Sequence, residues 1–396
     1  MFKKTLAAVA VLGAFAGSAM AANVTLYGVV DEALQYNYSK TMGGDKVDSY
    51  GLKSGAQAGS RWGLKGTEEL GNGLVAGFQL ESGFNADEGK SAQGGRLFGR
   101  VARVYLTGDF GTLSAGRDGA LVSGLGSVSY IYNYVALGTG WGDSTGSQGL
   151  YNFGYQDRAN NSLTYVTPNF GGFTAYAQYS FAADAQEEAS ANDNNRYAAL
   201  GAKYDMGAFS TGLVVDYLMK SEKPVADPSN LKAPKVDEDR DDQYTVSYGA
   251  SYDFGVAKVM GMVQYGKHMD SVVNNFSISH TGKNELGDDY KYKTTGLAVG
   301  DFEGYNLGLG VSAPVLGGTA FAQVNYIHAK DKDQDADQKV DGYGFGAAYS
   351  YPLSKRTSVY TYGSYGQFKT KGEDFGEDDG AKSKVGEFGV GMTHRF

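Results

Sequence analysis

Apolar and polar residues alternate along most of this chain, in segments of about ten residues. In the clearest segment, every second residue is apolar or aromatic, namely Tyr244, Val246, Tyr248, Ala250 and Tyr252. The residues between them are small or polar, namely Thr245, Ser247, Gly249 and Ser251. Because successive side chains of a β-strand point to opposite faces, this pattern predicts strands with one apolar and one polar face.

Short turns and long polar stretches separate these segments in strict alternation. Turn signals rich in Gly, Asn, Asp and Pro occupy residues 69–73, 108–111, 168–172, 204–207, 252–255, 314–318 and 351–355. Long polar stretches occupy residues 36–56, 85–95, 118–157, 183–195, 221–242, 268–300, 331–340 and 370–383. Seven turns and eight loops predict sixteen antiparallel strands, with both chain ends at the rim that carries the short turns.

An even number of strands, with short turns at one rim and long loops at the other, is typical of an all-β transmembrane barrel of the outer membrane. A closed barrel pairs every strand edge, which a bilayer requires. The short turns would then be periplasmic and the long loops external. The alternative is a soluble propeller or sandwich, whose strands also alternate but bury the apolar face in a core. The systematic asymmetry of the connections favours the barrel.

The first residues have the features of a secretory signal peptide. Lys3 and Lys4 precede an apolar run from Leu6 to about Ala16, and small residues lead up to Ala21. The run is too short to cross a bilayer as a helix, so we expect residues 1–21 to be removed on export. Residues 22–396 would then form one barrel domain.

Composition narrows the class of protein further. The chain has 59 glycines and 30 tyrosines but no cysteine, so disulfides and thiol chemistry are excluded. Glycine suits strongly curved strands, and tyrosine suits a membrane interface. Without Lys3 and Lys4, 33 basic residues face 44 acidic ones, a formal charge of −11, which argues against nucleic acid as a partner. No apolar run is long enough for a transmembrane helix.

Several long strings resemble the general porins of Gram-negative bacteria, in the branch found in β-proteobacteria and Neisseria. They are VTLYGVVD at 24–31, SRWGLKGTEELGNGLVAGFQLESGF at 60–84, LFGRVARVYLTGDFGTLSAGR at 97–117, RANNSLTYVTPNFGGFTAYAQY at 158–179 and GVGMTHRF at 389–396. They follow one another in the same order over the whole mature chain. The resemblance implies a passive channel for small hydrophilic solutes in the outer membrane.

The resemblance also implies partners and an arrangement of loops. It implies a homotrimer whose protomers contact membrane lipid and lipopolysaccharide, with the third external loop, residues 118–157, folded into the barrel. The final Phe396 resembles the C-terminal aromatic residue through which the outer-membrane assembly machinery recognises such proteins. Phe396 could equally be one more aromatic residue of the membrane interface.

Alternation indicates which charged residues face the lumen. Trp62 and Leu64 would face lipid, which leaves Arg61 and Lys65 inward, and the same reasoning places Arg103 and Arg158 inward. Arg96 and Arg100 are alternatives to Arg103 at the pore constriction, because they lie nearer the external end of the same strand. Arg117 is a further basic candidate, although alternation places it on the same strand face as Leu113 and Ala115. The candidate acids of the constriction loop are Asp118 and Asp143.

Arginine at a constriction predicts a mild preference for anions, because its charge persists at any relevant pH and its planar fork binds carboxylates and phosphates transiently. The main alternative to a general diffusion channel is a substrate-specific channel for a sugar or an organic acid. Such a channel usually carries an aromatic track along its lumen, for which Tyr27 and Phe321 are inward candidates. No continuous aromatic run is evident in the sequence.

Catalysis and metal binding are weakly supported. An outer-membrane hydrolase would need a nucleophile, a base and an orienting group in contact, but the four histidines, His268, His280, His328 and His394, accompany no nucleophile motif. Residues 331–337 imitate the start of a calcium-binding loop, yet Ala336 stands where the turn glycine is required. We therefore expect no enzyme, no cofactor and no dedicated metal site.

Overall fold

A computed structural model gives the fold of the chain. It describes residues 23–40, 46–138, 140–142, 153–155, 157–184, 194–221, 225–226, 234–235, 241–272, 277–283, 289–295, 298–332, 338–371 and 381–396. The expected signal peptide, Asp143 and most of the calcium-loop-like stretch lie outside these residues.

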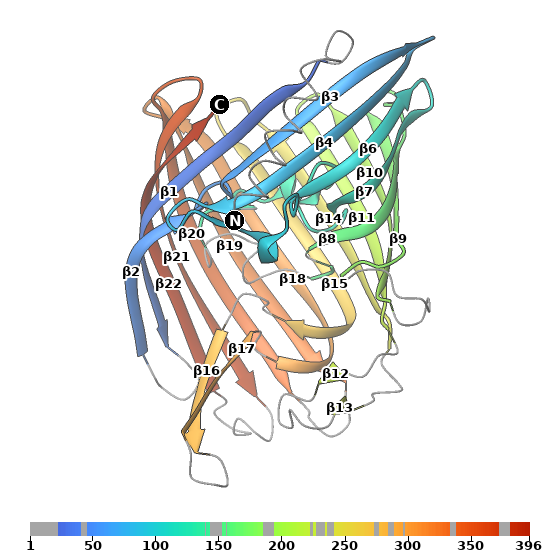
Figure 1. Cartoon of the computed structure of the whole chain (residues 1–396). Helices are drawn as coiled ribbons and strands as arrows, with labels where there is room; N and C mark the ends of the chain where they lie inside the picture. The colour runs from blue at the N-terminus through green and yellow to red at the C-terminus, as the bar shows by residue number, and fades with distance from the viewer. Residues whose placement is uncertain are drawn as a thin grey trace, which may run out of the picture.

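Sixteen antiparallel strands form one closed barrel (Figure 1). They are β1 (Thr25–Lys40), β3 (Arg61–Gly71), β4 (Leu74–Asn85), β6 (Val101–Gly108), β7 (Gly111–Gly119), β8 (Arg158–Val166), β9 (Phe173–Ser180), β10 (Arg196–Met206), β11 (Phe209–Met219), β14 (Gln243–Asp253), β15 (Lys258–Val272), β18 (Ala298–Val315), β19 (Gly318–Asp331), β20 (Lys339–Pro352), β21 (Thr357–Lys371) and β22 (Ala381–Arg395). The first and last strands close the ring, with Val29 opposite Arg395 and Lys40 opposite Lys384. The predicted fold class and all seven short turns are confirmed.

The remaining strands extend or decorate the barrel. The strand β2 (Lys46–Ser54) pairs with residues 32–40 of β1, whereas β3 pairs with residues 25–29 of the same strand. The strands β2 and β3 therefore occupy the same position in the wall, one after the other along β1. The expected first loop, residues 36–56, is therefore largely a strand hairpin. Short ladders β12 (Val225–Ala226) with β13 (Pro234–Lys235), and β16 (Ser277–Lys283) with β17 (Asp289–Thr295), belong to the long connections at the lower rim in Figure 1, while β5 (Lys90–Ser91) pairs with the end of β4.

The wall is polar inside and apolar outside, the reverse of a soluble protein. In β19, Gln323 and Asn325 are 2% and 7% exposed, whereas Val324 between them is 53% exposed. The same holds for β14, where Ser247 is buried and Tyr248 is exposed. Exposed apolar side chains on the outside and hydrogen-bonded polar ones within are what a wall between lipid and water requires. This excludes the soluble alternative.

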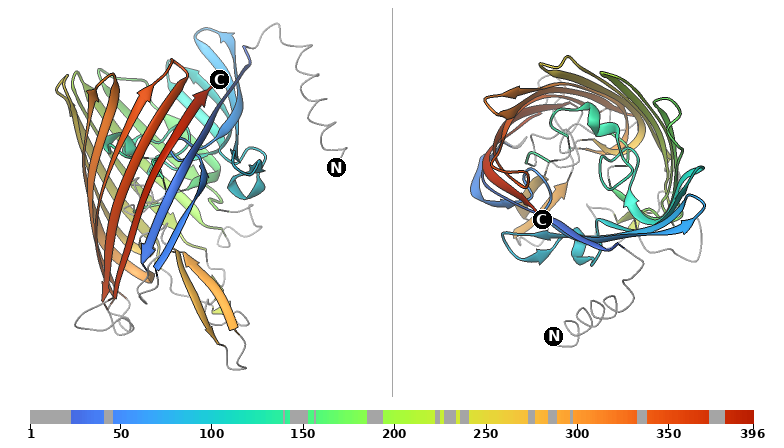
Figure 2. Two further views of the ribbon diagram at one scale, coloured as in Figure 1. Left: turned by 90° about the vertical axis from the view of Figure 1, so that its left-hand side faces the viewer. Right: turned by 90° about the horizontal axis from the view of Figure 1, so that it is seen from above.

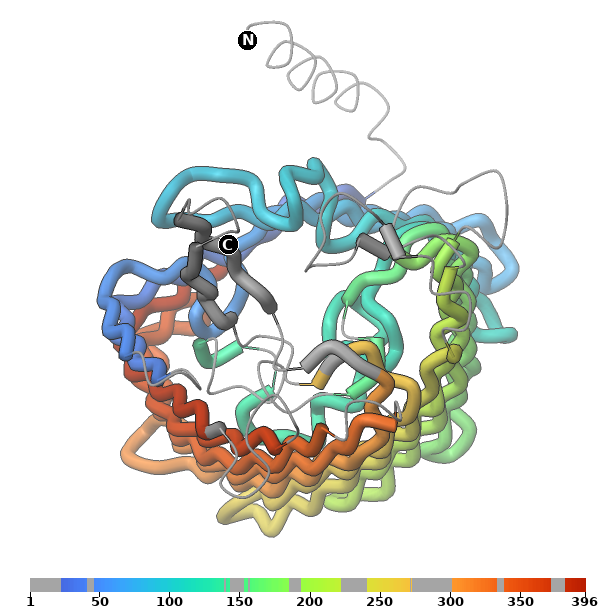
Figure 3. The backbone as a smooth tube through the Cα atoms, turned by 90° about the horizontal axis from the view of Figure 1, so that it is seen from below, coloured from blue at the N-terminus to red at the C-terminus, as the bar shows by residue number. Residues whose placement is uncertain are grey.

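Helical structure in the described residues is limited to two short 3-10 turns, η1 (Gln93–Gly95) and η2 (Ile131–Tyr134). Among these residues, no helix has both the length and the apolar character needed to cross a membrane. The turn η2 belongs to the third long connection, between β7 and β8. That connection enters the barrel, where it appears in teal inside the ring of strands (Figures 2 and 3).

Candidate functional site

The third loop begins by following the inner face of the wall. Two tyrosines of this loop fill spaces left by glycines on three neighbouring strands. Tyr130 lies against Gly201 of β10, where an added Cβ would meet its hydroxyl oxygen at 2.5 Å. Tyr134 lies against Gly249 of β14, where an added Cβ would meet its Cδ2 at 2.4 Å, and Gly212 of β11 contacts both rings. The glycines thus form a seat, Gly201, Gly212 and Gly249, that a side chain would obstruct.

Hydrogen bonds fix the loop in this seat. The Tyr130 hydroxyl donates to the carbonyl oxygen of Leu213 at 2.7 Å, and further along the loop the Leu137 amide donates to Gln323 Oε1 at 2.7 Å. The Tyr130 bond is partly buried and the Leu137 bond is buried, and polar groups removed from water are costly to leave without a hydrogen bond. The loop is therefore anchored at separate points on the wall.

At Trp141 and Gly142, the loop reaches the side of the barrel where β1 and β22 meet. The Gly142 amide donates to the carbonyl oxygen of Ala56 at 2.7 Å. Trp141 packs against Phe321 and Tyr360, with ring centroids 5.3 Å and 5.8 Å apart. Trp141 is only 8% exposed, so these rings form a packed cluster instead of an open aromatic track. The third loop thus spans the interior, as the resemblance implies.

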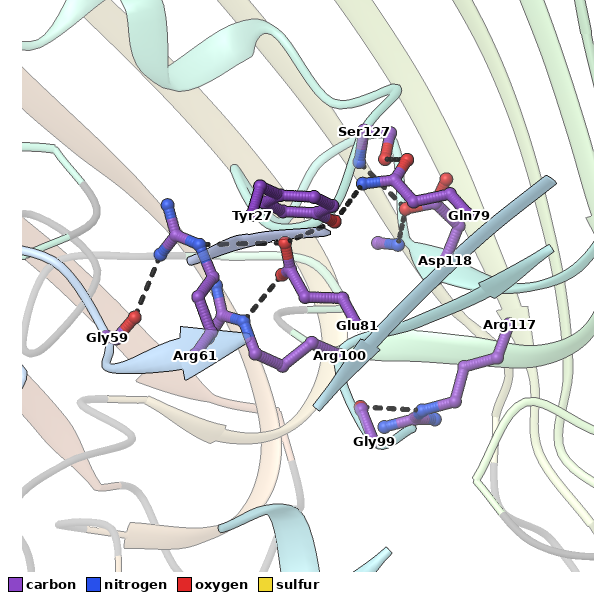
Figure 4. A network of polar contacts seen from close by, with 11 residues as sticks. Tyr27, Gly59, Arg61, Gln79, Glu81, Gly99, Arg100, Arg117, Asp118 and Ser127 are labelled. Atoms are coloured by element: carbon purple, nitrogen blue, oxygen red, sulfur yellow. Dashed lines mark hydrogen bonds and ion pairs between the residues drawn. The ribbon is translucent and has the colours of Figure 1, made fainter. Parts of the chain in front are cut away.

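A network of charged side chains occupies the inner wall where β1, β3, β4 and β6 are neighbours (Figure 4). Glu81 is its centre and is 7% exposed. Arg100 Nε contacts Glu81 Oε1 at 2.7 Å, and Arg61 Nε lies 3.6 Å from Glu81 Oε2. The Tyr27 hydroxyl donates to Glu81 Oε2 at 3.0 Å. One carboxylate therefore holds in place Arg61, at the start of β3, and Arg100, which immediately precedes β6.

Arg103 forms a second ion pair beside this network. Its Nη1 lies 3.3 Å from Asp118 Oδ2, and its Nη2 donates to Gln79 Oε1 at 3.4 Å. Asp118 Oδ1 also accepts the amides of Gly119 and Ser127, both at 2.8 Å. Asp118 therefore stands on the same wall as the arginines, where it shapes the root of the third loop.

Arg158 and Lys65 complete the wall. Arg158 is 6% exposed and interacts electrostatically with Arg100, Asp157, Arg117 and Glu81. Lys65 Nζ lies 5.4 Å from the centroid of the Tyr27 ring, a cation–π arrangement. We name Arg61, Lys65, Arg100, Arg103 and Arg158, together with Glu81 and Asp118, the basic wall. Its five cations exceed its two anions by three charges.

Arg96 and Arg117 meet at a different place. Both donate to Asn160 Oδ1, at 2.8 Å and 2.6 Å, and Arg117 also donates to the carbonyl oxygen of Gly99. In Figure 4, Arg117 stands apart from the Glu81 network. Straight alternation would place Asn160 in line with Arg158 on the lumen face. However, the pairing of β7 with β8 shifts register between Gly116 and Asp118. Alternation therefore does not determine which face of the strand Asn160 occupies.

Sequence reasoning missed Glu81 and Gln79. The alternation of side chains was the available signal: Gln79 and Glu81 share a strand face with Gly77 and Gly83, and the apolar Phe78 and Leu80 lie on the other face. This pattern places both polar side chains inward. Buried donors are also present on the wall: within the described residues, the Nε atoms of Arg103 and Arg158 have no hydrogen-bond partner.

Phe396 closes the last strand. Its amide and carbonyl exchange hydrogen bonds with Gly28, both at 3.1 Å, and its ring lies over Gly28, where an added Cβ would meet Cζ at 2.2 Å. The ring is 46% exposed. The terminal residue therefore helps join the two ends of the sheet.

Comparison with known proteins gives consistent results. A family model described as Gram-negative porin matches residues 7–373. An outer membrane porin protein of Bordetella pertussis is 35% identical over the full length of both chains. Outer membrane porin protein 32 of Delftia acidovorans is also 35% identical, over 90% of this chain and 88% of the relative. The solved structure of an anion-selective porin from Comamonas acidovorans covers 95% of this chain and all of its own, with a TM-score of 0.61 and 28% identity.

Proposed function

Because this chain belongs to the Gram-negative porin family and forms an outer-membrane diffusion channel, we propose that its lumen prefers small anions among hydrophilic solutes. The observation that supports this preference is the excess of three positive charges on the basic wall. The similar porin from Comamonas acidovorans is itself anion-selective, which supports the same preference.

The mechanism we propose is electrostatic selection without binding chemistry. Arg61 and Arg100 are held by Glu81, so their guanidinium groups keep fixed positions beside the route of the solute. A fixed cation lowers the energy of a passing anion and raises that of a cation. Arg96 and Arg117 would contribute at longer range, and Asp143 is retained as a candidate acid facing this wall.

General diffusion is favoured over a specific sugar channel because the lumen aromatic residues Trp141, Tyr360 and Tyr362 are buried in one cluster. Stacking on a sugar would require exposed faces. Liposome swelling with neutral sugars of increasing size tests this point. We expect rates that fall smoothly with size, and saturable uptake of one solute would contradict general diffusion.

The assembly that we propose follows the family pattern. Residues 1–21 act as a cleaved signal peptide, residues 22–396 form the barrel, and three copies associate beside lipopolysaccharide. Phe396 is recognised by the outer-membrane assembly machinery before it closes the barrel. The channel performs no bond chemistry and needs no cofactor. Native mass spectrometry of the purified protein tests the trimer, and its N-terminal residue tests the cleavage site.

A further inference from the structure

Two histidines near the ends of barrel strands each face carboxylates, but in different ways. His328 Nδ1 contacts one oxygen of Asp341, at 2.7 Å. His268 Nδ1 lies at nearly equal distances from both oxygens of Asp301, 2.9 Å and 3.0 Å, and at 3.2 Å from Asp241 Oδ2. The first geometry is an ordinary hydrogen bond. The second places three oxygens around one nitrogen.

The backbone brings these three side chains together from neighbouring strands. Asp241 closely precedes β14, His268 lies in β15, and Asp301 lies in β18. The ladder between β15 and β18 shifts register between Gly266 and Met269, and His268 has a φ of 55° within that bulge. A bulge re-aims a side chain that regular pairing would point elsewhere.

The negative charges of Asp241 and Asp301 exceed the positive charge that His268 can carry. Two carboxylates contribute two negative charges, and a protonated imidazole contributes at most one positive charge. The nearby Lys220 ammonium contacts Asp270 Oδ1 at 2.7 Å and the carbonyl oxygen of His268 at 2.7 Å. Lys220 is thus already paired with another acid.

The spacing of the three groups resembles that of ligands around a metal ion. Metal–nitrogen and metal–oxygen bonds of about 2.0–2.2 Å place neighbouring ligand atoms about 2.8–3.1 Å apart in octahedral geometry and about 3.3–3.6 Å apart in tetrahedral geometry. The separations from His268 Nδ1 are 2.9–3.2 Å, and all three ligand atoms lie within 4.8 Å of one another. A single imidazole N–H can be directed well at only one of these oxygens.

We propose that His268, Asp301 and Asp241 bind one divalent transition-metal ion at this rim of the barrel. Mixed imidazole and carboxylate ligands suit Zn²⁺, Ni²⁺ or Cu²⁺ better than Ca²⁺ or Mg²⁺, which prefer oxygen alone. The Asp241 side chain is 68% exposed and that of Asp301 is 32% exposed, so solvent reaches the site and water completes the coordination. The ion links the ends of three strands at the bases of long loops.

Calorimetric titration of the refolded full-length barrel in detergent with Zn²⁺ tests this proposal. Asparagine tolerates a positive φ, so His268→Asn preserves the bulge, and His328→Asn is the matched control. We expect one Zn²⁺ per chain, an affinity at least about tenfold weaker in His268→Asn, and an unchanged affinity in His328→Asn. Heat-dependent gel migration shows that each variant is folded. Asp241→Asn, at an exposed position before its strand, should also weaken binding.

Three outcomes would overturn the proposal. They are no Zn²⁺ uptake by the folded wild-type barrel, equal affinities in wild type and His268→Asn, or displacement of Zn²⁺ by an equal concentration of Ca²⁺. The last result would indicate a nonspecific acidic surface.

Discussion

Neutralising Glu81 should make the channel more selective for anions. Glu81 compensates part of the charge of Arg61 and Arg100, so Glu81→Gln raises the excess on the basic wall from three positive charges to four. Glutamine keeps the shape of the side chain and can still accept the Tyr27 hydroxyl, which contacts Glu81 at 3.0 Å. The change is therefore mainly electrostatic.

The size of the effect follows from the distance between wall and ion. A unit charge about 6 Å from an ion in water contributes about 0.7 kcal/mol. The contribution has opposite signs for an anion and a cation, so the difference between their free energies beside the wall changes by about 1.4 kcal/mol. The ratio of their permeabilities then changes about tenfold. At 1 M salt the Debye length falls to about 3 Å, and the effect should shrink accordingly.

The assay is the reversal potential of Glu81→Gln in planar bilayers across a gradient of KCl, at low and high salt. The matched control is Glu88→Gln, because Glu88 pairs with the exposed Lys90 in the second external loop, at 3.2 Å. We expect the control to match the wild type. An unchanged ratio in Glu81→Gln, or a shift toward cations, would refute the assignment of Glu81 to the wall of the conducting path.

Three further variants test other parts of the account. Gly249→Ala should displace Tyr134 and change the single-channel conductance, because the new Cβ would lie 2.4 Å from its ring, whereas Gly363→Ala, with its nearest contact at 3.5 Å, should conduct like the wild type. Arg103→Gln should lower the anion-to-cation permeability ratio by up to about tenfold, and an unchanged reversal potential would contradict this. Phe396→Ala should reduce the amount of folded protein in the outer membrane, measured by heat-dependent gel migration. Normal levels of folded protein would contradict a role of Phe396 in assembly.

The architecture could be predicted because its local signals are physically strict. A tight turn needs residues that accept positive φ, and Asn72 and Gly73, with φ of 50° and 76°, lie at one predicted turn. A lipid-facing strand needs an apolar residue at every second position, as β14 has. Turn positions and strand faces therefore follow from the sequence without tertiary information.

The site could be predicted only in part, because several of its residues lie where alternation does not apply. Arg100 precedes β6, so no strand parity sets its direction, and its contact with Glu81 depends on the path of the second loop. The slip of the ladder between β7 and β8 breaks the parity expected for Asn160. Likewise, Gly249 within an alternating strand gives no sign that Tyr134 will fill the space above it.

The most direct test of anion selection is the reversal potential of the wild-type channel across a tenfold KCl gradient, measured in planar bilayers with the purified protein. The excess of positive charge on the basic wall predicts a potential whose sign indicates chloride permeating faster than potassium. A potential of the opposite sign would contradict the proposed role of the arginines.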